Sequence, residues 1–345
     1  MALHGAAKGV CVSIRVACRH YSWENSVNLI KQLRERTSAP MKDVKAALVD
    51  SNWDIEAAQK ELRKRGKVLA SKKSSRTASE GLLALAQTPS KLALVELNCE
   101  TDFVARNDIF QHLALCLAKQ ALSLDNSSSS AFHVGPQSFE DLTLNLEHPK
   151  INGETSIHNA ITEVAAMMGE NVRLRRGYVM PTSPHGFIST YLHTSPQPGL
   201  GRIAGILSLQ VDDGKTQAEA LQRVGSELAM HVVAAKPLFL TKELVPSDAL
   251  ENEREILKSQ AEASGKPQMA IDKMVEGRLR KYFEDVVFMD QKFIMNDTLN
   301  VKAVLDNLSK EVGSSVRVVD FLRMEVGEGI ARQETDASET VAQVA

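Results

Sequence analysis

Near residue 100 the spacing of apolar residues changes from a period of two to the period of a helix. Residues 92–99 alternate between two faces, as a β-strand does, whereas the apolar residues of 110–121 recur at helical spacing. The acidic and aromatic pair Asp102 and Phe103 lies between these segments. Thr101 or Asp102 is suited to cap the helix, because a side-chain oxygen there accepts a hydrogen bond from a free backbone N–H. We predict a strand that leads into a helix, with Phe103 near solvent in the first turn.

Periodicity alone also allows a different position for Phe103. The residue lies seven positions before Phe110, so it could extend the apolar stripe of the helix. Apolar residues at helical spacing are usually buried, and this pattern by itself favours a core position for Phe103. Other features of the sequence must decide between the two positions.

Composition restricts the class of protein. A length of 345 residues favours about two domains, and a hydrophobic content of 43% is sufficient for packed cores. A formal net charge of -2 gives no overall attraction to nucleic acid, and an aromatic content of 5% is low for a base-stacking surface. No apolar run approaches the ~20 residues needed to cross a bilayer. We expect a soluble protein without direct nucleic-acid binding or membrane insertion.

The cysteines show neither a disulfide framework nor a metal site. They are Cys11, Cys18, Cys99 and Cys116. No two of them form a CxxC pair, and no histidines accompany them at metal-ligand spacing. We therefore predict no zinc site and no cofactor.

A hydrolase is the enzymatic alternative. It would use Cys99 as nucleophile, His112 or His231 as base and Asp102 as the orienting acid, and these groups would have to lie within hydrogen-bond reach. The end of an alternating strand is more typical of a buried, small apolar cysteine. Because no nucleophile elbow, oxyanion-hole motif or metal cluster accompanies the group, we predict that the chain is not an enzyme.

The first 23 residues contain no acidic residue. Lys8, Arg15 and Arg19 are distributed among small and apolar residues there, which is typical of a mitochondrial transit peptide. The two arginines interrupt the apolar run and argue against a secretory signal, and an ordinary disordered N-terminus is the other alternative. We predict a transit peptide over residues 1–23 and localisation in the mitochondrial matrix.

Residues 24–66 are predicted to form a module of three short helices. Pro40 suits a first helical turn, Asp54 is a favourable cap for the third helix, and Gly66 is suited to end it. A unit of this size buries little surface. We therefore expect the module to be attached to a larger core.

A basic tract joins this module to the core. Residues 60–76 contain eight basic residues and one acid. Such a tract could bind RNA phosphates, but without interleaved aromatics it is more typical of a solvated helix end and linker, here residues 67–80. We predict two core subdomains, 81–150 and 151–330, and a flexible tail over 331–345.

The core elements are predicted in blocks. A hairpin and a helix are followed by three strand patterns, at residues 172–180, 187–193 and 202–211. Their Pro- and Gly-rich connections are too short for crossover helices, which favours an antiparallel meander. Four helical segments and a last strand follow, at residues 216–233, 247–264, 267–285, 300–312 and 316–326. This order predicts an α+β fold of antiparallel sheets flanked by helices, and no sustained heptads indicate a long coiled coil.

Several motifs together resemble one family. They are LRERT at residues 33–37, MKDVKAAL at 41–48, DIEAA at 54–58, TDFVA at 101–105 and HVVAAKP at 231–237. In their order they resemble the elongation factor Ts family, the guanine-nucleotide exchange factors of elongation factor Tu. The resemblance covers roughly residues 24–335, far more than a single short motif. It implies that the three-helix module is ubiquitin-associated-like and that the Asp-Phe pair reaches into the GTPase, which reverses the core interpretation of Phe103.

The resemblance also implies which residues contact the partner. These residues are Arg34, Met41, Asp102, Phe103, Ile203, His231, Ile294 and Met295. In the family the module docks on the GTP-binding domain, the histidine lies close to the phosphate-binding loop, and an apolar pair makes a further contact. The implied partner is mitochondrial elongation factor Tu, in a transient nucleotide-free heterodimer.

An adaptor with a ubiquitin-associated domain and no exchange activity is the alternative, based on the module alone. The loop at residues 39–42 lacks the Met-Gly-aromatic pattern of ubiquitin binders. It also departs from the family, because Lys42 replaces a frequent second Met and Pro40 a common Gly.

The family's long coiled-coil insertion is not evident between His231 and Gly265. Together with the predicted transit peptide, the absence of this insertion favours a mitochondrial member of the family.

Overall fold

The computed structural model describes residues 25–37, 39–125, 130–212, 218–262 and 267–331. The predicted transit peptide and residues 332–345 of the predicted tail lie outside the described residues. After a helix over residues 25–37, the elements are α2 (Met41–Asp50), α3 (Ile55–Lys73), β1 (Glu80–Thr88), β2 (Lys91–Cys99), α4 (Asp102–Ala105), α5 (Asp108–Ala121), β3 (Phe132–Val134), η1 (Pro136–Phe139), β4 (Thr143–His148), β5 (Ile151–Ser156), α6 (Ile157–Met168), β6 (Arg173–Pro181), β7 (Gly186–His193), β8 (Leu200–Gly201), β9 (Ile203–Val211), α7 (Ala218–Ala235), η2 (Lys242–Leu244), α8 (Ser247–Glu262), α9 (Gln268–Val286), β10 (Lys292–Phe293), β11 (Asn296–Asn300), α10 (Val301–Val312) and β12 (Val316–Glu325). Helices and antiparallel strands thus occur in blocks, and the predicted α+β class is confirmed.

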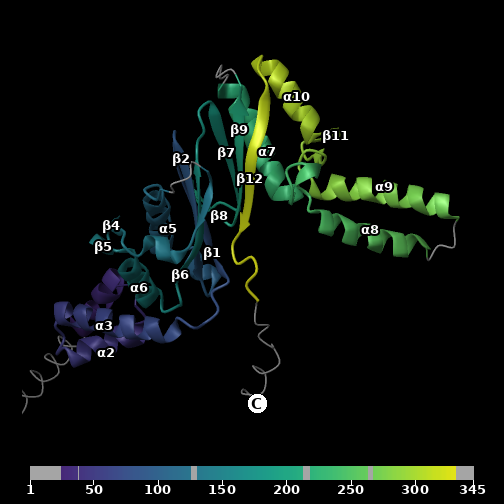
Figure 1. Cartoon of the computed structure of the whole chain (residues 1–345). Coiled ribbons are helices and arrows are strands. Elements are labelled where there is room, and N and C mark those ends of the chain that lie inside the picture. Colours follow the sequence, from purple (N-terminus) through teal and green to yellow (C-terminus); the bar gives the residue numbers. More distant parts are fainter. Residues whose placement is uncertain (1–24, 38, 126–129, 213–217, 263–266, 332–345) are drawn as a thin grey trace, which may run out of the picture.

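The three N-terminal helices pack around a small apolar core. Its buried members are Leu33, Val44, Ala47, Leu48, Ala58 and Leu62. The predicted cap of the third helix is confirmed, since the Asp54 carboxylate accepts hydrogen bonds from two N–H groups in the first turn of α3. Pro40 instead occupies the N-cap position directly before α2 and is not part of its first turn. Figure 1 shows this module at one end of the molecule, beside α6.

The predicted end of the third helix at Gly66 is wrong. Helix α3 continues to Lys73, so the first part of the predicted linker is helical. Gly66 instead lies where α3 packs on α6, and a Cβ atom added to it would be only 2.8 Å from Cβ of Ala166. The glycine allows two helices to approach closely. The lysines at the end of α3 favour its continuation, because cations are stabilising at a helix C-terminus.

Sheet 1 is a five-stranded sheet with the order β3-β6-β2-β1-β8. Strands β1 and β2 form the predicted hairpin, in which Thr88 pairs with Lys91. Helix α5 covers one face of the sheet, where Val95 and Leu97 of β2 join Phe110 and Leu113 of α5 in a buried core. This packing fixes the position of the chain between β2 and α5.

Sheet 2 has the order β12-β9-β7 and packs against the other face of sheet 1. The buried residues between the sheets include Leu92, Leu94 and Met180 from sheet 1, and Ile206 and Met324 from sheet 2. The opposite face of sheet 2 is covered by α7 and α10. The core therefore consists of four layers, helix, sheet, sheet and helix (Figure 1).

The predicted meander is wrong in one respect, because it would pair β6 with β7. Strand β6 does not pair with β7 but joins β2, whereas β7 and β9 form a hairpin in sheet 2. The physical reason is that β2 is buried along nearly its whole length, so its second edge needs a partner strand. The short connection after β6 passes from one sheet to the other.

A buried carboxylate ties the end of β12 to sheet 1. Glu96 is fully buried and accepts hydrogen bonds from Arg175 Nη1 at 3.0 Å, Arg176 Nε at 2.5 Å and the backbone N–H of Gly327 at 2.8 Å. Burial alone would raise the pKa of Glu96, but the hydrogen bonds from Gly327 and Arg176 outweigh it and hold the pKa below its usual range. The carboxylate therefore remains ionised and paired.

Helices α8 and α9 form a two-helix arm that projects from the core (Figure 1). Their seam contains the buried residues Leu257, Ala261, Ile271, Val275 and Leu279. Both helices were predicted, but their pairing was missed because this apolar seam is short and lies between charged faces. No helix in the part of the chain that the structure describes is long and apolar enough to span a membrane.

Candidate partner-binding surface

Phe103 lies in the Phe103 turn, residues 100–106, which joins β2 to α5. Its side chain is 78% exposed, whereas Phe110 is fully buried. Helix α4 contains only four residues, and Asn107 then caps α5 by accepting a hydrogen bond from the N–H of Ile109. Because this break separates the two helices, Phe103 does not continue the apolar stripe of α5. The predicted position near solvent in a first helical turn is correct.

Two buried residues attach the Phe103 turn to the core, and the predicted side-chain cap of its helix does not form. Val104 and Ala105 are buried in the core of sheet 1. Thr101 occupies the N-cap position, but its hydroxyl does not cap the helix and instead donates to the carboxylate of Glu170 at 2.6 Å. The Asp102 carboxylate accepts a hydrogen bond from Arg106 Nη2 at 2.6 Å and remains 42% exposed. Both members of the Asp-Phe pair thus face solvent.

A cleft of about 840 Å³ lies beside Phe103. Its lining includes Asp102 and Phe103 from the turn, Glu80 from β1, and Arg202. Arg202 forms an ion pair of 2.6 Å with Glu80. The predicted contact residue Ile203 follows Arg202 directly and is partly exposed. Ile203 is not among the residues that line the cleft and instead begins β9, where it pairs with His193 and Glu325.

His231 is fully buried at the end of α7. The backbone N–H of Ile294 donates to Nδ1 at 3.3 Å, so Nε2 carries the proton and donates to Oε1 of Gln291 at 3.0 Å. The ring also packs against Phe288 and Phe293. Burial lowers the pKa of His231, although the hydrogen bond with Gln291 acts in the opposite direction. The imidazole is therefore neutral, and in this conformation it has no surface for the predicted contact.

His231 supports the Ile294 turn, residues 291–296. Gln291 donates from Nε2 to the carbonyls of Ala235 and Asp285, which fixes the start of this turn to the ends of two helices. Ile294 is 40% exposed and Met295 57% exposed. The structure thus brings three predicted residues together, with the histidine beneath the apolar pair.

Comparison with known proteins identifies the family. Residues 100–328 match the family model described as Elongation factor TS. The chain belongs to the elongation factor Ts family. It is 75% identical to Elongation factor Ts, mitochondrial, of Ricinus communis over 323 residues, which cover 92% of this chain and 85% of that protein. The corresponding Arabidopsis thaliana protein is 69% identical over 324 residues, which cover 93% of this chain and 82% of that protein.

A bacterial relative is also similar along most of its length. Elongation factor Ts of Brucella anthropi is 40% identical over 320 residues, which cover 93% of this chain and 98% of that protein. The two plant relatives are named as mitochondrial, and this confirms the predicted mitochondrial localisation. The Phe103 turn, His231 and the Ile294 turn all lie within the region that matches the elongation factor Ts model.

Arg34 and Met41 lie on the three-helix module, outside the region matched by the elongation factor Ts model. Both are exposed, and Met41 retains 56% of its surface at the start of α2. Figure 1 shows the module and the α8–α9 arm on opposite sides of the sheets. The structure therefore does not bring these two residues together with the Ile294 turn.

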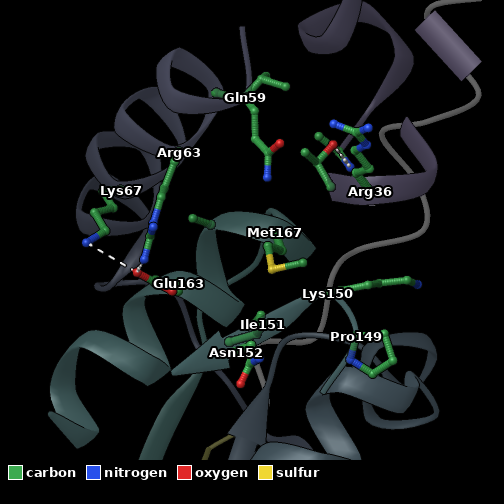
Figure 2. Close-up of a pocket in the computed structure, with 14 residues that line it drawn as sticks. Arg36, Gln59, Arg63, Lys67, Pro149, Lys150, Ile151, Asn152, Glu163 and Met167 are labelled. Carbon is green, nitrogen blue, oxygen red and sulfur yellow. Dashed lines mark hydrogen bonds and ion pairs between the residues drawn. The ribbon is translucent and has the colours of Figure 1, made fainter. Parts of the chain in front are cut away.

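Sequence reasoning missed a second cleft, of about 320 Å³, between the module and the core. Figure 2 shows Arg63 and Lys67 of α3 directed at Glu163 of α6, whereas Lys150 of the β4–β5 hairpin lies on the other side of the cleft. Glu163 pairs with Arg63 and, at 3.6 Å, with Lys67. Two cations of the basic tract are thus already paired. The lining residues come from four separate segments, so no local pattern in this elongation factor Ts sequence could reveal the cleft.

The groups of the hydrolase alternative are not assembled. Cys99 is fully buried, its thiol donates to the carbonyl of Thr101, and burial raises its pKa to about 12, with a smaller contribution from the charge of Glu170. His112 instead lies 3.5 Å from the sulfur of Cys116. Within the described ranges of this elongation factor Ts chain, no group of three or more His, Cys, Asp or Glu side chains is arranged to hold a metal ion.

Proposed function

We propose that this chain is a guanine-nucleotide exchange factor that promotes the release of GDP from mitochondrial elongation factor Tu during translation elongation. The observation that carries the proposal is the 78% exposed Phe103 beside an exposed Asp102, on a turn anchored in the core. An aromatic side chain held on an anchored turn is the type of residue that often carries a large share of the binding energy of an interface. Membership of the elongation factor Ts family supports the choice of partner.

Exchange requires no covalent chemistry. A GTPase holds its nucleotide through backbone N–H groups, a lysine and Mg²⁺. An exchange factor needs only a surface that fits the nucleotide-free conformation better than the GDP-bound one. In our proposal Phe103 inserts between helices of the GTPase, and Asp102 assists in displacing the elements that organise Mg²⁺. Phosphate and Mg²⁺ contacts then weaken, and GDP dissociates.

The remaining predicted residues are proposed as further contacts with the GTPase. Ile203 makes a further contact with the GTPase, and Ile294 and Met295 form a separate apolar contact that His231 supports from the core. Arg34 and Met41 dock the three-helix module on the GTP-binding domain. The complex is a transient heterodimer, since linkage requires that GDP weakens binding of this chain by the same factor as the chain weakens GDP.

The test measures release of a fluorescent GDP analogue from mitochondrial elongation factor Tu, with and without this chain. We expect strong acceleration by the unmutated chain. Phe103→Ala should weaken the nucleotide-free complex by roughly 2 kcal/mol or more, because a central aromatic anchor carries a large share of interface energy. Met269→Ala is the matched control, since Met269 is 75% exposed on the α8–α9 arm and outside the proposed interface.

The outcomes separate the function from the anchor. If Phe103→Ala accelerates GDP release as well as the unmutated chain does, the exchange function is supported but Phe103 is not the anchor. No acceleration by the unmutated chain would refute exchange. It would favour the ubiquitin-associated adaptor, which a titration with ubiquitin then tests.

A further inference from the structure

The backbone that precedes Phe103 is held by the side chain of Glu170. Oε2 of Glu170 accepts hydrogen bonds from the N–H groups of Glu100 at 3.1 Å and Thr101 at 3.0 Å. Oε1 accepts from the Thr101 hydroxyl at 2.6 Å. Both carboxylate oxygens are thus engaged by the two residues directly before the Asp-Phe pair. Glu170 follows Gly169, whose left-handed φ of 70° ends α6.

The contact is reciprocal. Oε1 of Glu100 accepts a hydrogen bond from the backbone N–H of Asn171 at 2.7 Å. The Asn171 amide donates to the carbonyls of Ser74 at 3.1 Å and Arg76 at 2.7 Å, at the end of the segment that leaves α3. Residues 100–101 and 170–171 therefore clamp each other, and the clamp is attached to a third segment.

This clamp compensates for the weakness of α4. A helix of four residues is too short to be stable alone, and α4 has no side-chain cap at its N-terminus. Phe103 itself has little packing, because most of its surface is exposed. The direction in which it points is thus set by Val104 and Ala105 on one side and by the clamped residues on the other. Holding an anchor in its bound conformation reduces the ordering entropy lost on binding.

We propose that Glu170 is a positioning residue for exchange, which preorganises the Phe103 turn for insertion into the GTPase; this inference rests on the function proposed above. Glu170 does not touch the partner. It acts through Phe103. Its removal should therefore affect the concentration of GTPase needed for exchange more than the maximal rate.

Three variants test the role. Glu170→Ala removes the acceptors and should raise the half-saturating concentration of the GTPase–GDP complex about tenfold, with the maximal exchange rate changed by less than about twofold. Glu170→Gln should retain near-normal exchange, since its carbonyl oxygen accepts from both N–H groups and its amide donates to the Thr101 hydroxyl. Glu154→Ala is the matched control, because Glu154 also accepts from a threonine hydroxyl, Thr143 at 3.0 Å, but lies on the β4–β5 hairpin. It should exchange normally.

A double-mutant cycle with Phe103→Ala decides whether Glu170 acts through Phe103. If it does, adding Glu170→Ala to Phe103→Ala should change the half-saturating concentration by less than about twofold. An undiminished tenfold effect in the Phe103→Ala background would overturn the proposal, and so would a Glu170→Ala protein that loses folded fraction and maximal rate but keeps its half-saturating concentration. These results require exchange by the unmutated chain, so they are distinct from failure of the proposed function.

Discussion

The Phe103 turn and the Ile294 turn present apolar side chains to solvent in different ways. The first is held at its base by the charged carboxylate of Glu170, through hydrogen bonds to backbone groups. The second lies over the neutral imidazole of His231, which is itself part of the core. Because the Glu170 clamp acts on backbone groups through hydrogen bonds, we expect its loss to alter the turn more than the fold. The Ile294 turn rests on a ring that is part of the core, so we expect mutation of that ring to lower the free energy of unfolding.

The largest effect that distinguishes the two turns should come from His231→Ala. The substitution leaves a cavity against Phe288 and Phe293 and removes the partner of Ile294 N–H, so we expect a loss of about 3 kcal/mol in the free energy of unfolding. Phe103→Ala should change the same free energy by less than about 0.5 kcal/mol, because Phe103 is mostly exposed. Urea denaturation followed by circular dichroism measures both.

A surface histidine provides the control for this comparison. His158 is exposed on α6, and His158→Ala should alter the free energy of unfolding by no more than about 0.5 kcal/mol. Equal losses of stability in His231→Ala and Phe103→Ala would remove the distinction between the turns.

The second effect concerns binding by the Ile294 turn. Ile294→Ala and Met295→Ala remove partly exposed side chains, so each should weaken the nucleotide-free complex by about 1 kcal/mol with little change in the free energy of unfolding. Titration calorimetry with the nucleotide-free GTPase measures the affinity. Ile256→Ala, at a residue 52% exposed on α8, is the control that should bind normally. Unchanged affinity in both variants would leave the Phe103 turn as the decisive contact.

Local patterns predicted the elements well but not their packing. The end of β2 at Cys99 and the exposed first turn at Asp102 follow from the change in period, although the predicted side-chain cap does not form. The break before α5 was missed, although Asn107 is a favourable cap and was the available signal. The pairing of β6 with β2 could not be read from either strand, since each strand shows only that it needs a partner.

The supporting residues of the candidate site were beyond sequence reasoning for a related reason. His231 was placed on the apolar stripe of its helix, which is correct, but Gln291 lies 60 residues further along the chain. Glu170 lies 69 residues after Thr101, and no local motif links them. The role of Gly66 in helix packing could not be predicted either, because its neighbour Ala166 comes from a distant helix. Side chains that position a site depend on tertiary contacts, whereas exposed contact residues are marked by local features.

The smallest effect is the pH dependence of the Ile294 turn. Burial lowers the pKa of His231 in the folded protein below the value of 6.5 for a free histidine, so the unfolded chain binds a proton at higher pH than the folded protein does. Stability contributed by the neutral ring is thus complete above about pH 6.5 and falls as the pH is lowered towards the folded pKa, by at most about 1.4 kcal/mol per pH unit. His231→Asn removes this titration and leaves the other histidines unchanged. We therefore expect the unmutated chain to lose more stability than His231→Asn between about pH 7.5 and about pH 5.5 in urea titrations. Parallel losses would show that His231 does not titrate differently in the folded and unfolded states, and the contrast with the Glu170 clamp would then rest on packing alone.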